Sequence, residues 1–397
     1  IFLGLVTLMF LGLSHPLALL MGDESLTTLF RISALIIPAY ASDSFYFYYY
    51  SGVHRFGLQS ALKLTRSFLR VTVILGLAYF FALKGIIVGY IFVPLLVFFL
   101  AWCLDRREGV SSSLSGGQNE FSMMSIARLA LPVTTFLILF EVLMSFDLYV
   151  VKIFLHDDKL VGLYNAALTV ARIPSYLFYA LTLILLPTIS ESAAVSDIAR
   201  MRELVSKALR FMVLMTLPFL ALAFAYPKAM VELFFGAPFA AASGMLPWLL
   251  LGTGLLAIPY VLSFAYKGAG IIRVPLVFFL SCLLVNILLD VWLLPFFGLQ
   301  GIAIAKAVTG AVALPVFLFS LRRRFGADLY VWGGLKVLFI AIAIGWIGSV
   351  GSDTVGHLLV IGSGLLALYF ILAWFSGAIL LEDRQLFAKL SFQRSEK

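Results

Sequence analysis

The sequence predicts an all-α integral membrane protein. Three observations lead to that class: the composition, the length of the apolar stretches, and the distribution of basic residues among the loops. Of the 397 residues, 62% are hydrophobic and only 12% are charged, whereas a soluble domain has about a quarter of its residues charged. Because 37 phenylalanines would leave a soluble surface strongly apolar, we expect lipid to surround most of the chain.

Twelve apolar stretches are long enough to cross a bilayer. The hydrocarbon core is about 30 Å thick, and an α-helix needs about 20 residues to cross it. The sequence therefore predicts twelve transmembrane helices, at residues 1–21, 27–51, 64–83, 85–104, 126–154, 160–190, 208–226, 242–265, 272–294, 298–321, 331–350 and 356–380.

Basic residues gather in alternate loops and their flanking turns. This distribution predicts which side of the membrane each loop faces. Twenty of the 28 lie on one side: Arg55, Lys63, Arg66, Arg70, Arg106, Arg107, Arg128, Arg200, Arg202, Lys207, Arg210, Lys267, Arg273, Arg322, Arg323, Arg324, Arg384, Lys389, Arg394 and Lys397. The opposite loops hold Lys84, Lys159 and Lys228, and counting Arg31 and Lys152 raises that total to five. Since basic loops stay in the cytoplasm, we expect a multi-pass protein of the cell's inner membrane with a cytoplasmic C-terminus. The net charge of +8 then suits anionic lipid headgroups, and no nucleic-acid partner is needed to explain it.

An internal repeat relates the two halves of the chain at a spacing of about 215 residues. Gly22 corresponds to Gly236, Gly52 to Gly268, Gly85 to Gly298, and Arg106-Arg107 to Arg322–Arg324. Both repeats begin and end on the same membrane face, as in transporters built from parallel repeats. The second repeat has six predicted helices and the first has four, so we expect two helices to be missing from a protein with fourteen spans.

The repeat predicts two pseudo-equivalent helical lobes around a central cavity, followed by a peripheral helix pair. The expected parts are an N-terminal lobe at 1–104, a cytoplasmic linker at 105–125, a C-terminal lobe at 126–324, and the helix pair with a cytoplasmic tail at 325–397.

Two local patterns resemble a known family. The first is the run from Asp147 to Leu155 followed by Val161-Gly-Leu-Tyr-Asn-Ala-Ala167 and LILLPTISE. The second is FFLSCLLVNILLDVWLLPFFGLQGIAIAKAVTG, with Asn286, Pro295, Gly298 and Gly301 at helix–loop–helix positions. Together they resemble the O-antigen and capsule-type polysaccharide flippases of the multidrug/oligosaccharidyl-lipid/polysaccharide exporter superfamily, over essentially the whole chain.

That resemblance implies a function in polysaccharide biosynthesis. The chain would be a flippase that moves a lipid-linked oligosaccharide, on a polyprenyl-phosphate-type carrier, from the inner to the outer leaflet by alternating access. It implies a transporter rather than an enzyme, a lipid-linked glycan and membrane lipids as partners, and a glycan polymerase or glycosyltransferases nearby. We expect a monomer.

Ionisable residues inside the apolar stretches are the candidate site. Arg172 lies about 18 Å from the outer end of its predicted helix, close to the midplane, and Pro174 follows it and favours a helix break. Glu141 is expected within a turn or two of the same depth, as a partner of Arg172. A guanidinium matches phosphate oxygens, so we expect Arg172 to bind the carrier phosphate, the alternative being a structural Arg–Glu pair.

Other charged residues are weaker candidates for the cavity. Asp147 and Lys152 lie five residues apart, and so about 140° apart around the helix, and they are not expected to pair. Each, with Arg31, is a candidate for the cavity rim. Asp290 and Lys306 lie on consecutive helices and are interpreted as a structural pair or, less favoured, as a coupling-ion site.

Several apparent motifs are set aside. Gly252-Thr-Gly254 and Gly362-Ser-Gly364 match part of a dinucleotide fingerprint, but they lie inside membrane-length helices, where close helix packing explains them. Four scattered histidines and two cysteines make no metal site, so we predict neither metal nor cofactor.

Rival functions remain open. A multidrug extruder and a lipid II flippase share the superfamily fold. Two further alternatives belong to a different class: a membrane scaffold that transports nothing, and a membrane glycosyltransferase. In the glycosyltransferase, the acidic pairs Asp23-Glu24 and Asp157-Asp158 would be the metal ligands.

Overall fold

The computed structural model describes residues 2–108 and 123–378, and all regular structure within those ranges is helical, as the sequence predicts. The chain forms two compact units, Ile1–Ser122 and Met123–Lys397. Most of the expected linker (109–122) and the end of the chain (379–397), with Arg384, Lys389, Arg394 and Lys397, lie outside the described residues.

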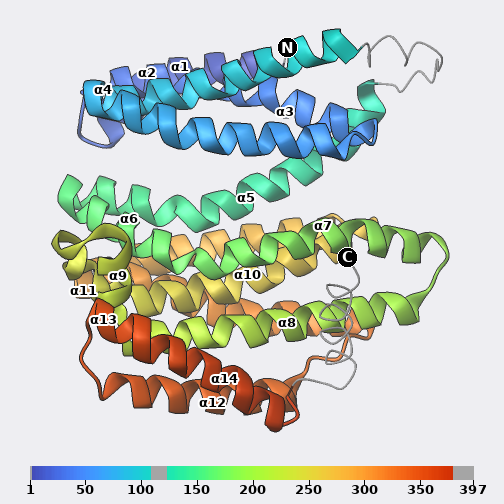
Figure 1. Cartoon of the computed structure of the whole chain (residues 1–397), viewed down its shortest axis with the longest axis vertical. Helices are drawn as coiled ribbons and strands as arrows, with labels where there is room; N and C mark the ends of the chain where they lie inside the picture. The colour runs from blue at the N-terminus through green and yellow to red at the C-terminus, as the bar shows by residue number, and fades with distance from the viewer. Residues whose placement is uncertain (1, 109–122, 379–397) are drawn as a thin grey trace. The chain divides into compact units, whose positions relative to one another are not determined.

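The described part of the first unit, residues 2–108, contains four helices: α1 (Phe2–Leu20), α2 (Leu26–Ala34), α3 (Ile36–Gly52) and α4 (Phe56–Glu108) (Figure 1). Its core lies between α3 and α4, where Tyr46, Phe47 and Tyr50 pack against Val93, Val97 and Ala101. The single helix expected at 27–51 is interrupted at Leu35, which separates α2 from α3.

The second unit contains the rest of the described chain. Its helices are α5 (Met123–Leu155), α6 (Asp158–Ala171), α7 (Ile173–Ala194), α8 (Ile198–Ala225), α9 (Pro227–Phe235), the 3₁₀ turn η2 (Ala237–Met245), α10 (Leu246–Gly268), α11 (Arg273–Phe325), α12 (Val331–Ser349), α13 (Val355–His357), the short π-helical turn η3 (Leu358–Gly362) and α14 (Ser363–Phe375). The long helices run side by side in Figure 1, with α12 packed against α8 and α14.

Two of the longer helices in this unit, α6 and α8, begin at side-chain caps. The Asp157 carboxylate accepts hydrogen bonds from the backbone N–H groups of Lys159 (2.8 Å) and Leu160 (3.3 Å), and Asp197 accepts one from Arg200 (2.9 Å). Such caps satisfy donors that the first helical turn leaves unpaired. Asp157 therefore has a structural role at the start of α6.

The two 53-residue helices, α4 and α11, each fold back on themselves near their middle. The reversal lies at Ala82 (φ 47°, ψ −133°) in α4 and at Gly298 (φ 56°, ψ −138°) in α11. Gly85 has the same surroundings as Gly301. A Cβ on Gly85 would meet the Leu77 carbonyl oxygen at 2.1 Å, and one on Gly301 would meet that of Leu293 at 2.5 Å.

This geometry corrects the sequence alignment of the repeats at one point. Gly85 corresponds to Gly301 and Ala82 to Gly298, so the pairing of Gly85 with Gly298 was wrong by three residues. The other correspondences agree with the structure, because Gly22 (φ 69°) and Gly236 (φ 82°) both have positive φ, while Gly52 and Gly268 end α3 and α10.

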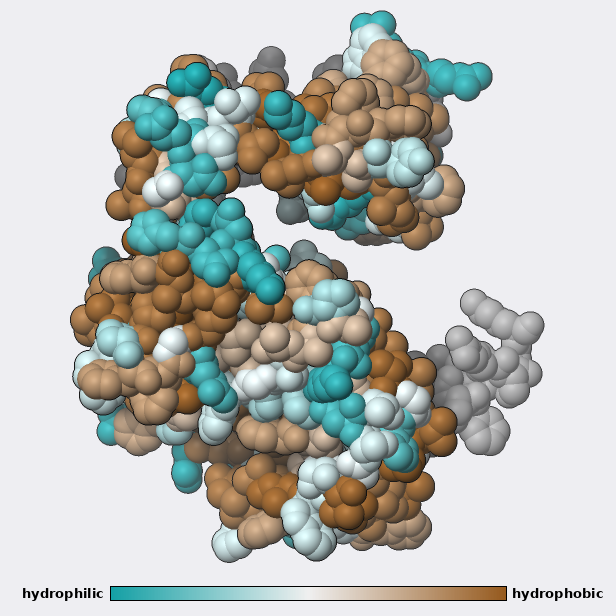
Figure 2. All heavy atoms as spheres, turned by 90° about the vertical axis from the view of Figure 1, so that its left-hand side faces the viewer, coloured by the Kyte–Doolittle hydropathy of each residue, from teal (hydrophilic) through white to brown (hydrophobic). Residues whose placement is uncertain are grey.

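The surface of the helices is suited to lipid. Eight helices in the described part of the chain are long and apolar enough to span a membrane, two of them being the folded-back α4 and α11. Trp332 and Phe375 are 81% and 82% exposed. Figure 2 looks onto the helix ends and shows hydrophilic residues on the end face of the second unit, with hydrophobic residues along its flanks. The chain is a multi-pass membrane protein, and the count of twelve helices stays a prediction.

Close packing of α10 on α11 positions the polar core of the second unit. A Cβ on Gly252 would lie 2.6 Å from the carbonyl carbon, the carbonyl oxygen and Cγ of Lys306, and one on Gly310 would lie 2.9 Å from the Gly252 carbonyl oxygen. Small residues permit this backbone approach. In this helix the apparent dinucleotide motif is therefore a packing motif, as expected from its place in an apolar stretch.

Candidate functional site: a buried charge cluster and a helix break

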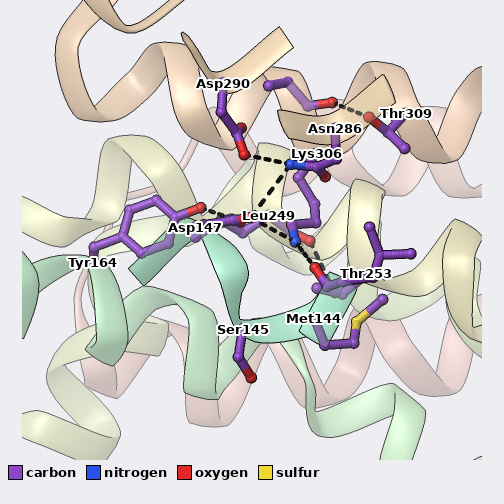
Figure 3. A network of polar contacts seen from close by, with 12 residues as sticks. Met144, Ser145, Asp147, Tyr164, Leu249, Thr253, Asn286, Asp290, Lys306 and Thr309 are labelled. Carbon is purple, nitrogen blue, oxygen red and sulfur yellow. Dashed lines mark hydrogen bonds and ion pairs between the residues drawn. The ribbon is translucent and has the colours of Figure 1, made fainter. Parts of the chain in front are cut away.

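A cluster of charged side chains lies at the centre of the second unit, between α5, α6 and α11 (Figure 3). The ammonium group of Lys306 lies 2.8 Å from Oδ1 of Asp147, and both side chains are completely buried. Lys306 also donates a hydrogen bond to the Leu143 backbone carbonyl. The structure thus pairs Lys306 directly with Asp147, and the direct pair expected between Lys306 and Asp290 was wrong.

Tyr164 and Asn286 extend the cluster to a second carboxyl group. The Tyr164 hydroxyl donates to Oδ2 of Asp147 (2.6 Å), and Nδ2 of Asn286 lies 2.5 Å from Oδ2 of Asp290 and 3.4 Å from Oδ1 of Asp147. Asp290 and Asn286 are both 0% exposed. Oδ1 of Asp290 has no hydrogen-bond partner in the described part of the chain.

The cluster therefore holds two carboxyl groups against one ammonium group. A buried charge is stable in an apolar environment when it is paired, and an unpaired one takes up a neutralising proton or counterion. The Asp147–Lys306 pair meets that condition. Asp290 has only the Asn286 amide as a direct donor, so it is the group with uncompensated charge when ionised.

Helical periodicity explains why these side chains meet. Asn286 and Asp290 are four residues apart, which places them on one face of α11 before its reversal at Gly298. Lys306 follows that reversal, so the fold-back brings it beside them. Asp147 lies on α5, which packs along α11.

The second feature is a break in the expected sixth transmembrane segment. α6 ends at Ala171 and α7 begins at Ile173, with Arg172 between them and Pro174 in the first turn of α7. Proline supplies no backbone N–H, so the helical hydrogen-bond ladder is interrupted here. The hydroxyl of Thr253 lies 2.8 Å from the Ala171 carbonyl oxygen and 2.8 Å from that of Leu249, and it compensates one acceptor at the break.

Arg172 anchors the break to α5. Its Nη2 donates to the backbone carbonyl of Met144 and, at 3.1 Å, to the hydroxyl of Ser145. Its Nε is buried and has no hydrogen-bond partner in the described part of the chain. The guanidinium is therefore held from one side by neutral oxygen atoms.

The expected pair of Arg172 with Glu141 was wrong. Glu141 is exposed on α5, and the hydrogen bonds of the Arg172 guanidinium go to Met144 and Ser145 instead. A single turn of helix separates Glu141 from Ser145, which contacts Arg172, but the Glu141 side chain is exposed and does not reach the guanidinium.

Lys152 belongs to neither feature, and Arg31 is a residue of the first unit. Lys152 forms an ion pair with Asp158 at the start of α6, and its side chain is 11% exposed. As expected, Asp147 and Lys152 do not pair with each other. Arg31 is exposed on α2 in the first unit. Asp147 lies inside the helix bundle of the second unit rather than on an open surface.

Tyr164, Asn286 and Thr253 also belong to the site. The sequence analysis did not predict them as site residues, because it selected charged residues and these three are uncharged. The i, i+4 spacing of Asn286 and Asp290 inside an apolar helix is the signal that indicates them. Within 2–108 and 123–378, no group of three or more His, Cys, Asp or Glu residues could hold a metal ion.

Solved structures of known proteins share this fold, and a known family matches the sequence. The chain is similar to the lipid II flippase MurJ in an inward closed conformation, with a TM-score of 0.71 and 18% identity over 94% of this chain and 81% of that one. It is also similar to the Vibrio cholerae MATE transporter VcmN in its bent form, with a TM-score of 0.58 and 17% identity over 81% and 76% of the two chains. No curated protein matches the sequence. Residues 1–243 match the family described as polysaccharide biosynthesis protein, and since this is more than half of the chain, the protein belongs to that family.

Proposed function

We propose that the protein is a flippase that moves a lipid-linked oligosaccharide, on a polyprenyl-phosphate-type carrier, from the inner to the outer leaflet. Family membership supports a role in polysaccharide biosynthesis, and the fold is that of flippases and transporters in its superfamily. The fold, with apolar helices throughout, suits substrate movement across a bilayer. In this proposal the two repeats are two lobes that alternate around a central cavity.

The observation that carries the proposal is Arg172 at the break between α6 and α7. Broken helices mark the binding sites of many transporters, because they free polar groups at membrane depth. Both hydrogen bonds of the guanidinium in the described part of the chain use Nη2 and neutral acceptors. Its positive charge is therefore available to an anion, and phosphate is the anion that a guanidinium fork matches best.

The Asp147–Lys306–Asp290 cluster has a different proposed role. Because Lys306 and Asp147 neutralise each other at zero exposure, we assign that pair to the stability of the second unit. Asp290 carries the excess carboxyl and is the residue of this cluster through which a coupling cation or proton would act. The sequence contains no G-x-x-x-x-G-K-[ST] loop, so its residues give no support to nucleotide-driven transport.

The fold also supports two related functions. A lipid II flippase and a multidrug extruder have the same fold. A central arginine favours a phosphate-bearing substrate over the cationic drugs of an extruder, because like charges repel. A membrane glycosyltransferase is disfavoured because Asp157 and Asp158 are already used by the α6 cap and by Lys152.

Complementation tests the proposal. The gene is expressed in strains that each lack one export protein: an O-antigen flippase, a capsule flippase, a lipid II flippase or a multidrug extruder. We expect restored surface glycan in one of the first two strains. Rescue of the lipid II or extruder strain alone would contradict the proposed substrate. Reporter fusions in the same experiment check the proposed inner-membrane location and cytoplasmic C-terminus, and purification checks the proposed monomer.

A further inference from the structure

Two cavities lie on either side of one arginine near the end of α11. The first, of about 580 Å³, is lined by Tyr266, Val274, Phe319, Ser320, Arg323 and Arg324, among others. The second, of about 640 Å³, lies toward the start of α12 and is lined by residues that include Leu314, Leu318, Phe319, Arg322, Arg323 and Val331. Phe319 and Arg323 line both cavities and so stand between them.

The walls of the second cavity are mostly apolar, those of the first combine apolar with polar side chains, and arginines line both cavities. The Arg323 guanidinium lies 4.4 Å from the centre of the Phe319 ring, so its charge is held directly over the apolar wall. Arg322, Arg323 and Arg324 are all exposed, and none forms an ion pair with an acidic residue in the described ranges. The nearest acidic residue along the chain, Asp328, accepts a hydrogen bond from the backbone N–H of Tyr330 (3.0 Å).

The rim lies where a bilayer's headgroups are expected. The part of α11 after Gly298, residues 299–325, is about 40 Å long, whereas the hydrocarbon core is about 30 Å thick. A spanning helix of this length therefore carries its last turns, with the three arginines, into the headgroup layer.

We propose that this site binds an anionic diacyl phospholipid. Its phosphate contacts Arg323, and one acyl chain enters each cavity. Two cavities with apolar side chains in their walls, on either side of a shared arginine, match a lipid with two chains, whereas a polyprenyl carrier has a single chain and enters one cavity. Basic pockets between helices at the cytoplasmic face are suited to anionic headgroups. The site is independent of Arg172 and of the proposed transport function.

The first repeat supplies a matched control. Arg106 lies near the end of α4 as Arg323 lies near the end of α11, and its guanidinium stacks on Trp102, four residues earlier, at 3.9 Å. Arg106→Gln therefore removes the same charge, with the same kind of stacking, from the corresponding end of the other repeat.

Native mass spectrometry of the purified chain with added lipid tests the site. We expect phosphatidylglycerol to bind more tightly than phosphatidylcholine, Arg323→Gln to weaken phosphatidylglycerol binding about fivefold, and Arg106→Gln to leave the tightest-bound lipid in place. Val331→Trp, which places a bulky ring at the wall of the second cavity, should weaken the diacyl lipid but leave single-chain lysophosphatidylglycerol bound. Thermal melting of each variant shows whether it is folded.

Four results would overturn the proposal. They are equal binding of both phospholipids, equal losses in the Arg323 and Arg106 variants, displacement by inorganic phosphate alone, and stoichiometric competition by a polyprenyl diphosphate. The third result would assign the site to a free anion and the fourth to the transported carrier.

Discussion

Lys306 of α11 and Asp147 of α5 form an ion pair at 2.8 Å with both side chains completely buried. They are far apart in the sequence, and the pair joins the first helix of the second unit to the last part of its longest one. Removing one member of a buried pair leaves the other charge without compensation, which is more damaging than replacing both. The pair is therefore a sensitive point for the stability of the second unit.

Lys306→Met should destabilise the protein by about 3–5 kcal/mol, because it leaves Asp147 charged and buried without its partner. Protein level in the membrane and thermal melting in detergent measure this loss. The double variant Lys306→Met/Asp147→Leu should recover a large part of it. Lys159→Met, at an exposed position on α6, is the control and should change little. A single variant as stable as that control would contradict the role of the pair.

Asp290→Asn should be tolerated far better than Asp147→Asn. The cluster has one carboxyl more than it has ammonium groups, and neutralising the excess one preserves the Asp147–Lys306 pair. Melting temperatures of the two variants are compared directly. Equal losses would show that Asp290 is as essential to packing as Asp147. Full stability combined with lost glycan export would instead indicate a coupling role.

Ala82 and Gly298 occupy equivalent reversals with nearly the same positive φ, a conformation unfavourable for residues with a Cβ. Ala82→Gly should therefore stabilise the first unit by about 1 kcal/mol, and Gly298→Ala should destabilise the second by a similar amount. Thermal melting of both variants checks the prediction. Shifts of the same sign would show that the two reversals are not equivalent.

Gly252→Ala should disturb the cluster from outside it, because the added Cβ meets Lys306 backbone atoms at 2.6 Å. We expect a loss of more than about 1 kcal/mol, as in overpacked cores. Gly364→Ala is a matched control, since Gly364 lies in the other glycine motif and a Cβ added there would meet nothing within 4 Å. Similar melting temperatures for the two variants would rule out the close packing of α10 on α11.

Arg172→Lys should keep the charge at the break but lose the planar fork, and export should fall substantially. Arg172→Ala should abolish export with a near-normal protein level. Because Arg172 contacts Met144 and Ser145 rather than Glu141, adding Glu141→Gln should not restore export or abundance. Restoration by Glu141→Gln would show that the arginine serves a structural Arg–Glu pair.

The sequence allows the helical class, most helix positions and the break at Arg172 to be predicted, because each depends on local composition. Apolar length predicts a spanning helix, and Pro174 predicts an interruption close to where it occurs. The repeat could be detected from its glycines. Its alignment at the reversal could not be fixed, because Ala82 adopts a conformation that usually indicates glycine.

The partners of the charged residues could not be predicted. Depth along a helix follows from residue number, but the direction of a side chain depends on which helices pack together. Lys306 meets Asp147 because the Gly252 contact brings α11 close to α10 and because α5 packs along α11. Glu141 lies on the same helix as Asp147 and is exposed, although its depth alone made it a candidate partner for Arg172.

The central claim is that this chain moves a lipid-linked oligosaccharide across a bilayer, and a reconstituted transport assay tests it most directly. Proteoliposomes carry the purified chain and a fluorescent polyprenyl-diphosphate oligosaccharide, and an added glycosidase cleaves the substrate molecules that reach the outer leaflet. We predict that cleavage proceeds to near completion with the wild-type chain and stops at the initial outer-leaflet fraction with Arg172→Ala. Cleavage by the wild-type chain that stops at the same fraction as in protein-free liposomes would contradict the claim.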